Sequence, residues 1–282
     1  MHRAFYEYPA DSYGLVYWSH ADGWIPYPVP SASTRWIGQD TGEGQDNRMN
    51  ISDFVDVLDD GMPHFDFIMF DACFMMSVEV AYEVRNYTDY YIGSPTENPG
   101  PGAPYDKVVP YMFKPGAAAQ MAEAYFNHYK DNYKAGEGIS NANWTGGTSI
   151  CAVRTDALDD LADVTGQLLE RADNESVPSF NTVFDYDKRD MEEGHVGYYD
   201  FSQMMEMRLD ADAYVAWKNV FDASIVYWNT TDKNYSMFKR MFSMEGTNGI
   251  THYIPLSVDS KAAEAYRSMA WYKAAGLENM GW

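Results

Sequence analysis

Short apolar runs alternate with longer amphipathic stretches through the first hundred residues of the chain. The short runs are rich in β-branched and aromatic residues, which is typical of strands, at 13–18 (YGLVYW), 65–70 (FDFIMF) and 90–94 (YYIGS). Helical spacing is found at 50–61 (NISDFVDVLDDG) and 74–85 (FMMSVEVAYEVR). Strands that alternate with helices in this way predict an α/β fold with a parallel sheet and right-handed crossovers.

The second half of the chain continues this alternation less regularly. Helical spacing recurs at 117–133, 156–172, 211–225 and 260–276, and strand-like runs lie at 148–154 and 249–257. The 282 residues are enough for one large domain, and we find no internal repeat or clean linker. We predict a main domain at 1–175 and a C-terminal α/β subdomain at 176–282 that packs on the same core. Two stretches rich in proline, glycine and small polar residues, 25–50 and 95–105, predict functional loops.

Charge and composition narrow the classes of partner. The chain has 42 acidic and 20 basic residues and a net charge of −22, spread along its length. Such a surface repels nucleic acid and anionic membranes and attracts cationic peptides, although it equally suits the solubility of an exported protein. No apolar stretch approaches the ~20 residues of a membrane span. The aromatic-rich composition favours an extracellular, periplasmic or cell-surface protein, although the N-terminus shows no signal-peptide pattern.

The cysteines and most histidines give no sign of a metal centre. Cys73 and Cys151 are the two cysteines, and they lack zinc-binding spacing. One disulfide is arithmetically allowed, but Cys151 lies in an alternating strand-like run where a buried free thiol is ordinary. Four histidines have no partner at metal-ligand spacing and are expected at the surface or as satisfied core residues: His64, His128, His195 and His252. The sequence signatures of zincins, serine hydrolases, P-loop proteins and dinucleotide-binding proteins are absent.

His20 and Cys73 each follow a predicted strand, 13–18 and 65–70 respectively. Open α/β sheets carry their ligand sites at the carboxyl ends of strands, and neighbouring strands lie only ~4.8 Å apart. Cys73 also precedes the predicted helix 74–85, whose N-terminus would stabilise a thiolate. A free cysteine at such a junction is more often a core filler, and a histidine beside a turn is usually a surface residue. Because the two residues occur at successive strand ends, a cysteine nucleophile with a histidine partner is about as well supported as this ordinary interpretation.

At these residues the chain resembles the clostripain family of cysteine peptidases, which is grouped with caspases, legumain and gingipains. The resemblance lies in a strand that ends in His and a later strand that ends in Ala-Cys, within 13–24, 65–85 and 90–108. It continues more loosely through YYDFSQMM, GITHYIPLS and MAWYKAAG. The resemblance implies a caspase-like three-layer αβα sandwich with a largely parallel central sheet. It also implies a cysteine endopeptidase that acts through a Cys-His dyad.

The resemblance assigns the catalytic roles residue by residue. Cys73 would be the nucleophile that attacks the scissile carbonyl, and His20 would protonate the leaving amine. The backbone N–H groups of Cys73 and Ala21 would bind the oxyanion. Many relatives have glycine where Ala21 stands, and alanine keeps the N–H but narrows the backbone conformations.

The resemblance also implies a preference for Arg or Lys at the P1 position of the substrate. Asp71, two residues before Cys73, would form the S1 pocket with support from Glu97, and Ser94 and Thr96 could line it. Each has a structural alternative: Asp71 would equally suit a cap of the following helix, and Ser94 and Thr96 would suit turn positions.

Further expectations follow from the resemblance. Arg35, in the loop between His20 and Cys73, is the preferred candidate for self-cleavage, although a plain surface arginine is the more ordinary interpretation. Some relatives need calcium, so calcium could bind the acidic segment 40–47 despite its lack of EF-hand spacing, but no cofactor is required. Relatives usually have a strand–helix–strand unit before the histidine strand, so we expect that the first strands of the fold are missing here, which would leave an unpaired sheet edge.

We therefore expect a monomer whose partners are peptides or proteins with basic residues, and no nucleic acid. The alternative function is that of a catalytically inactive relative, an exported protein that binds peptide or glycan without cutting it.

Overall fold

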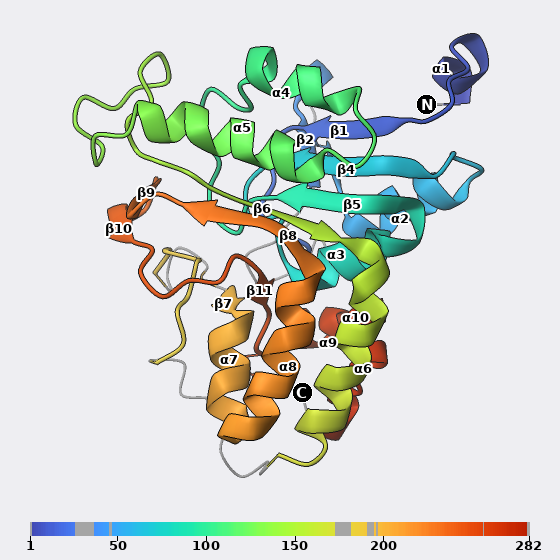
Figure 1. Ribbon diagram of the computed structural model, residues 1–282, viewed down its shortest axis with the longest axis vertical. Helices are drawn as coiled ribbons and strands as arrows, with labels where there is room; N and C mark the ends of the chain where they lie inside the picture. Colours follow the sequence, from blue (N-terminus) through green and yellow to red (C-terminus); the bar gives the residue numbers. More distant parts are fainter. Residues whose placement is uncertain are drawn as a thin grey trace.

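A central five-stranded sheet lies between two layers of helices (Figure 1). The computed structural model describes residues 2–25, 37–44, 47–172, 182–190, 195, 197–255 and 257–280. The sheet has the order β1-β4-β5-β6-β8, with β1 (Gly14–Trp18), β4 (Phe65–Asp71), β5 (Thr88–Gly93), β6 (Ser149–Arg154) and β8 (Ile225–Thr230). Three two-stranded pairs are formed by β2 (Ile37–Asp40) with β3 (Asn47–Met49), β7 (Tyr199–Asp200) with β11 (Thr251–His252), and β9 (Lys233–Ser236) with β10 (Arg240–Ser243).

The helices fall before, between and after these strands. The α-helices are α1 (His2–Glu7), α2 (Ile51–Asp59), α3 (Val78–Val84), α4 (Tyr105–Met112), α5 (Ala118–Asp131), α6 (Leu158–Leu169), α7 (Phe201–Arg208), α8 (Ala211–Ser224), α9 (Lys261–Tyr266) and α10 (Ala270–Ala274). Short 3-10 helices are η1 (Gly42–Gly44), η2 (Arg85–Tyr87), η3 (Thr155–Ala157) and η5 (Leu277–Met280). Of the helices in the described part of the chain, none combines the length and the apolar character that a membrane span requires.

The predicted αβα sandwich with a largely parallel sheet is confirmed, with one strand reversed. β1, β4 and β5 pair in parallel, as the strand–helix order predicts. β6 is antiparallel to both β5 and β8, so β8 points in the same direction as the first three strands. Two helices, α4 and α5, connect β5 to β6, so the chain returns to the edge that it left. A single crossover helix would have made β6 parallel.

Alternate residues of β4 face the two helical layers, as the period of a strand requires. Phe67 and Met69 pack against the layer of α4 and α5. Ile68 and Phe70 pack on the opposite face, in the larger core that α2, α3, α6, α8 and α10 share. Both faces of the sheet are therefore buried, and the site-bearing groups lie at the ends of its strands.

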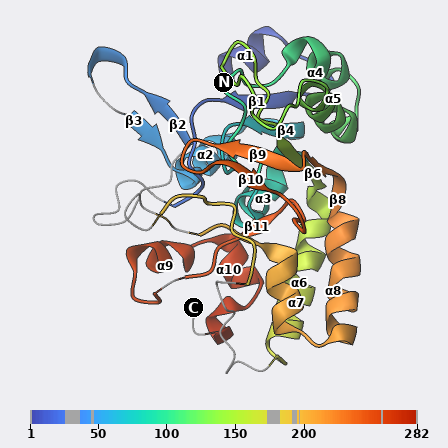
Figure 2. The same ribbon diagram turned by 90° about the vertical axis from the view of Figure 1, so that its left-hand side faces the viewer.

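Other elements also differ from the sequence prediction. The stretch 25–50 includes the β2–β3 hairpin, which projects from the body of the molecule (Figure 2). The predicted helix 260–276 is divided into α9 and α10. The stretch 225–230, which the pattern assigns to no strand, forms β8. The division at residue 175 stays a prediction, although β8 extends the same sheet as the strands before it.

Candidate active site

His20 and Cys73 lie at the same edge of the sheet, at the ends of neighbouring parallel strands. The register of β1 and β4 pairs Trp18 with Asp71, and His20 and Cys73 follow this pair by two residues each. The side chain of His20 is exposed, and Cys73 is half-buried. The two residues therefore leave the sheet level with each other, as the sequence analysis expects.

The turn after β4 differs from the prediction that Cys73 stands at a helix N-terminus. Helix α3 begins only at Val78, where Ser77 caps it by accepting a hydrogen bond from the Val80 N–H. Between Cys73 and this cap, Phe74 has a φ of 58°, which an α-helix excludes. The N–H of Phe74 donates to the carbonyl of Thr96 at 3.0 Å, and that of Met76 donates to the carbonyl of Ser94 at 3.0 Å. The prediction was wrong because the loop after β5 binds this segment, so no helix dipole stabilises a Cys73 thiolate.

The surroundings of Cys73 favour the neutral thiol. Its Sγ accepts a hydrogen bond from the Asn98 N–H at 3.3 Å. Burial, together with the nearby carboxylates of Glu97, Asp22 and Asp71, raises the pKa of the Cys73 thiol to about 12, although the hydrogen bond from Asn98 opposes the rise. At neutral pH the resting protein therefore holds a thiol, which needs a base or a compensating positive charge to become a nucleophile.

Asp71 is buried and is held by the loop that follows β5. Its Oδ1 accepts from Asn98 Nδ2 at 3.1 Å, and its Oδ2 accepts from the Ala103 N–H at 2.7 Å and from the Tyr105 hydroxyl at 3.0 Å. Burial raises the pKa of Asp71, while these hydrogen bonds oppose the rise. Because Ser77 caps α3, Asp71 is not the helix cap that its position also allowed.

Gly102 packs closely against this carboxylate and against Trp18. Gly102 has a φ of 76°, and a Cβ atom there would lie 3.0 Å from Asp71 Oδ2 and 3.1 Å from Trp18 Nε1. Trp18 is 71% exposed, although it is the register partner of Asp71. Any larger residue at position 102 would therefore crowd Asp71 and Trp18.

The other predicted pocket residues have different partners. Ser94 and Thr96 are fully buried, and their hydroxyl groups bond to each other and to Ser149. The carboxylate of Glu97 accepts from the Ser236 hydroxyl and from the Met237 N–H, so it holds the turn between β9 and β10. Glu97 remains near Cys73 electrostatically, whereas Ser94 and Thr96 act on the cysteine turn through their backbone carbonyls.

The turn after β1 carries Ala21 next to His20. The Gly38 N–H donates to the His20 carbonyl at 2.9 Å, and Ala21 forms an isolated antiparallel bridge with Ile37. Because the hydrogen bond joins the residues next to Ala21 and Ile37, these two form a non-hydrogen-bonded pair of the antiparallel ladder. The N–H of Ala21 therefore points away from β2 and does not donate to it. The next residue, Asp22, binds Arg189, which belongs to the segment 182–190.

Sequence reasoning missed Asn98, Asp22 and Arg189. Asn98 stands beside Glu97 in a loop that was recognised as functional, so its position gave a signal. Asp22 and Arg189 are 167 residues apart and belong to no motif, so only the fold reveals the pair. Arg35 lies outside the described residues.

Two of the histidines without metal-ligand spacing lie as expected, one in the core and one at the surface. His252 is a buried, hydrogen-bonded core residue, which confirms the expectation, and His64 lies at the surface against Asp89. Among the described residues, no group of three or more His, Cys, Asp or Glu side chains is arranged to hold a metal ion. Cys73 and Cys151 are both free thiols.

Comparison with known proteins identifies the family. The profile of the clostripain family matches residues 1–279. The chain belongs to the clostripain family. It is therefore a cysteine-type peptidase, and the predicted family is confirmed. No curated protein sequence matches it.

Solved structures of C11 cysteine proteases are similar to this clostripain-family chain. A secreted C11 cysteine protease from Bacteroides thetaiotaomicron, in complex with an irreversible peptide inhibitor, is 43% identical, with a TM-score of 0.85 over 96% of this chain and 74% of that one. A B. fragilis cysteine protease is 38% identical, with a TM-score of 0.78 over 88% of this chain and 99% of that one. An inactive zymogen C11 protease from Parabacteroides distasonis is 27% identical, with a TM-score of 0.79 over 97% and 73% of the respective chains.

Proposed function

We propose that this peptidase is an endopeptidase that cleaves after Arg or Lys through a dyad of Cys73 and His20. The observation that carries the proposal is the register of β1 and β4, which brings these two residues to adjacent strand ends. The B. thetaiotaomicron protease bound to a peptide inhibitor supports a peptide substrate.

The reaction follows from the placement of the groups. His20 takes the Sγ proton as Cys73 attacks the scissile carbonyl, so that an S–C bond forms and the carbonyl oxygen becomes an oxyanion. The N–H groups of Cys73 and Ala21 donate to this oxygen. The protonated His20 then gives its proton to the amine as the C–N bond breaks, and water hydrolyses the thioester that remains.

The carboxylates around Cys73 support the basic P1 residue. Asp71 lies beside Gly102, and Asn98 holds its carboxylate in place. A guanidinium or ammonium group that reached Asp71 would meet a buried carboxylate that is already fixed in position. The cation would also offset the negative charges that raise the pKa of Cys73, so a basic substrate would favour formation of the thiolate.

The remaining expectations extend the same proposal. The secreted relative supports a location outside the cytoplasm, and the zymogen relative supports activation by cleavage, for which Arg35 is our candidate. We further propose a monomer that needs no cofactor, with calcium binding at 40–47 as a variant of this proposal. Activity measured with and without a calcium chelator decides between the two.

The test uses the two cysteines as a matched pair. An arginyl acyloxymethyl ketone should label the wild type and Cys151→Ala equally, because Cys151 is fully buried in β6. Cys73→Ala should not be labelled, and His20→Ala should be labelled at least ~100-fold more slowly, because it lacks the base. Undiminished labelling of either the Cys73 or the His20 variant would refute the dyad, and equal labelling by a neutral P1 probe would refute the basic preference.

A further inference from the structure

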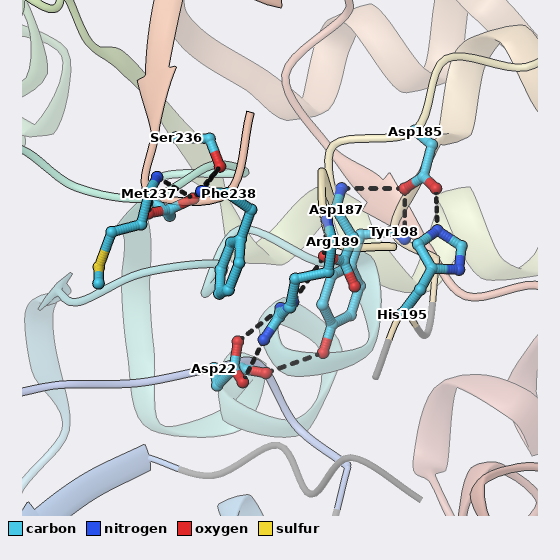
Figure 3. A network of polar contacts seen from close by, with 10 residues as sticks. Asp22, Asp185, Asp187, Arg189, His195, Tyr198, Ser236, Met237 and Phe238 are labelled. Atoms are coloured by element: carbon cyan, nitrogen blue, oxygen red, sulfur yellow. Dashed lines mark hydrogen bonds and ion pairs between the residues drawn. The ribbon is translucent and has the colours of Figure 1, made fainter. Parts of the chain in front are cut away.

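Three segments that are distant in sequence meet beside the proposed dyad. They are the turn after β1 (20–24), the turn after β4 (73–76) and the segment 182–190 with Tyr198. Figure 3 shows Asp22 of the first turn beside Arg189 and Tyr198. β1 is an edge strand of the five-stranded sheet as described, with β4 as its one partner there. The turn that carries His20 is therefore held from outside this sheet, by β2 and by the segment 182–190.

Arg189 supplies a buried two-point ion pair to this turn. Its Nη1 and Nη2 donate to the two carboxylate oxygens of Asp22 at 2.6 and 2.7 Å, and its Nε donates to Asp187 Oδ1 at 2.7 Å. The Arg189 side chain is only 6% exposed. A planar guanidinium that binds one carboxylate at two points fixes both its distance and its orientation.

The same group reaches the cysteine turn. The Arg189 Cζ lies 5.3 Å from the ring centre of Phe74, the residue after Cys73, and 5.2 Å from that of Phe238. Tyr198 makes a parallel connection, because its hydroxyl donates to the Asp22 carbonyl at 3.1 Å and its ring stacks on Phe74 with centres 5.8 Å apart. Asp22 is thus held through its side chain by Arg189 and through its backbone by Tyr198 (Figure 3). Both of these residues also pack on Phe74.

We propose that Arg189 is a positioning residue of the peptidase, which holds the turn of His20 and Ala21 against the turn of Cys73 by clamping Asp22 over Phe74. The inference rests on the proposed dyad, because the role of Arg189 is to fix the position of His20 relative to Cys73. Asp22 stands two residues after His20 and one after Ala21. A shift of this turn would move the base and an oxyanion donor together, and small displacements of such groups slow catalysis strongly.

Substitution of Arg189 tests the clamp through kcat and through the reactivity of Cys73 without substrate. Arg189→Met should lower kcat about 10- to 100-fold and leave KM within about threefold, because the variant still binds substrate. Alkylation of Cys73 by iodoacetamide should slow in parallel, and its pH profile should move to higher pH, because the Asp22 carboxylate near the thiol loses the positive charge of Arg189. Arg189→Lys, which keeps the charge but not the two-point geometry, should fall between the wild type and Arg189→Met.

The control is an exposed ion pair that the same segment forms with the turn between β9 and β10. Lys239 Nζ binds Asp190 Oδ1 at 2.9 Å with both side chains largely exposed, so Lys239→Met should have wild-type kcat and alkylation. If Arg189→Met does not fold, as judged by its thermal transition, Arg189→Lys and Tyr198→Phe carry the test. The Tyr198 variant keeps the ring stack and loses the donor to Asp22, and we expect its kcat to fall several-fold.

Wild-type kcat in Arg189→Met would overturn the inference, and where this variant does not fold, wild-type kcat in both Arg189→Lys and Tyr198→Phe would do so. A change in KM alone would also overturn it, because Arg189 would then be a substrate contact. A rise in activity would overturn it as well, because Arg189 would then obstruct the cleft. The failure of the dyad is separate from these, because it would show as retained activity in Cys73→Ala or His20→Ala.

Discussion

Asp71 is a carboxylate whose position is fixed before any substrate arrives. Asn98, Ala103 and Tyr105 donate to it, and it is 2% exposed. A carboxylate offers about four lone-pair sites, so it can still accept from a cation. Because the donors hold it in place, an incoming guanidinium would gain an ion pair without first ordering its partner.

Asp71→Asn should therefore change the specificity of the peptidase. The amide keeps the size of the side chain but leaves a substrate cation without its counter-charge in a buried site, which costs several kcal/mol. We expect kcat/KM for Arg and Lys at P1 to fall at least ~100-fold, and kcat/KM for a neutral P1 residue to change by no more than about threefold. Parallel assays with peptides that differ only at P1 measure both values. An equal loss on both peptides would mean that Asp71 supports the turn rather than the pocket.

Single residues differ in how well their neighbours in sequence reveal their role. Cys73, His20 and Asp71 stand at fixed offsets from apolar runs, so pattern and resemblance together could select them. Asn98 contacts Cys73 across 25 residues, and Arg189 contacts Asp22 across 167. No periodicity in the sequence reveals either contact, because each depends on where the rest of the fold places a loop.

Among the elements, β1, β4 and β5 were predictable because buried strands are short apolar runs. The start of α3 was not, because residues 74–77 have a helical composition and yet are bonded to the loop after β5. The direction of β6 depends on the number of helices that precede it, and β8 directly follows α8, so its apolar residues continue the helical pattern. Tertiary context overrode local propensity at each of these points.

At the level of elements, Glu97 connects the loop after β5 to the β9–β10 hairpin. Its carboxylate accepts from Ser236 and Met237, at the turn between the two strands. A two-stranded hairpin is marginally stable alone, so these bonds contribute much of its order. In Glu97→Ala, we expect amide hydrogen exchange across 233–243 to accelerate about 5- to 30-fold, equivalent to a loss of about 1–2 kcal/mol, as measured by mass spectrometry.

The matched control for this hairpin is Glu245→Ala, an exposed carboxylate just after β10, which should leave exchange unchanged. Glu97→Ala should also lower kcat/KM for basic substrates less than Asp71→Asn does, since its carboxylate is committed to the hairpin. Unchanged exchange together with a large loss of basic preference would instead restore Glu97 to the S1 pocket.

In the molecule as a whole, the core joins the cysteine-bearing part of the chain to its C-terminal part through a buried polar pair. Glu79 of α3 accepts from the Tyr253 N–H at 2.7 Å. His252 of β11 lies 4.0 Å from the Glu79 carboxylate; its Nδ1 donates to the Tyr253 carbonyl and its Nε2 accepts from Trp271 Nε1 of α10. These two contacts define a neutral imidazole, and burial lowers the pKa of His252 to about 3, so the pair is no salt bridge at neutral pH.

Glu79 should make the stability of the protein depend on pH. Burial raises the pKa of Glu79 to about 7 from 4.5, so the folded protein holds a proton that the unfolded chain releases. This contribution to the free energy of unfolding is fully present below about pH 4.5 and is lost as the pH rises to 7. The total loss is on the order of 3 kcal/mol at most. In Glu79→Gln the loss is absent, so the variant should gain stability relative to the wild type between pH 4.5 and 7.5 in urea unfolding.

His252 also makes the free energy of unfolding depend on pH, with the opposite sign to Glu79. Its contribution is the same in the wild type and in Glu79→Gln, so the difference between the two proteins reports Glu79 alone. The lowered pKa of His252 contributes stability above about pH 6.5 that is lost as the pH falls. Glu123→Gln, at an exposed position on α5, should run parallel to the wild type throughout. If Glu79→Gln runs parallel as well, the Glu79 carboxylate is ionised in the folded protein. The His252 ring would then have to be charged to balance it, against the acceptor role that the Trp271 N–H assigns to it.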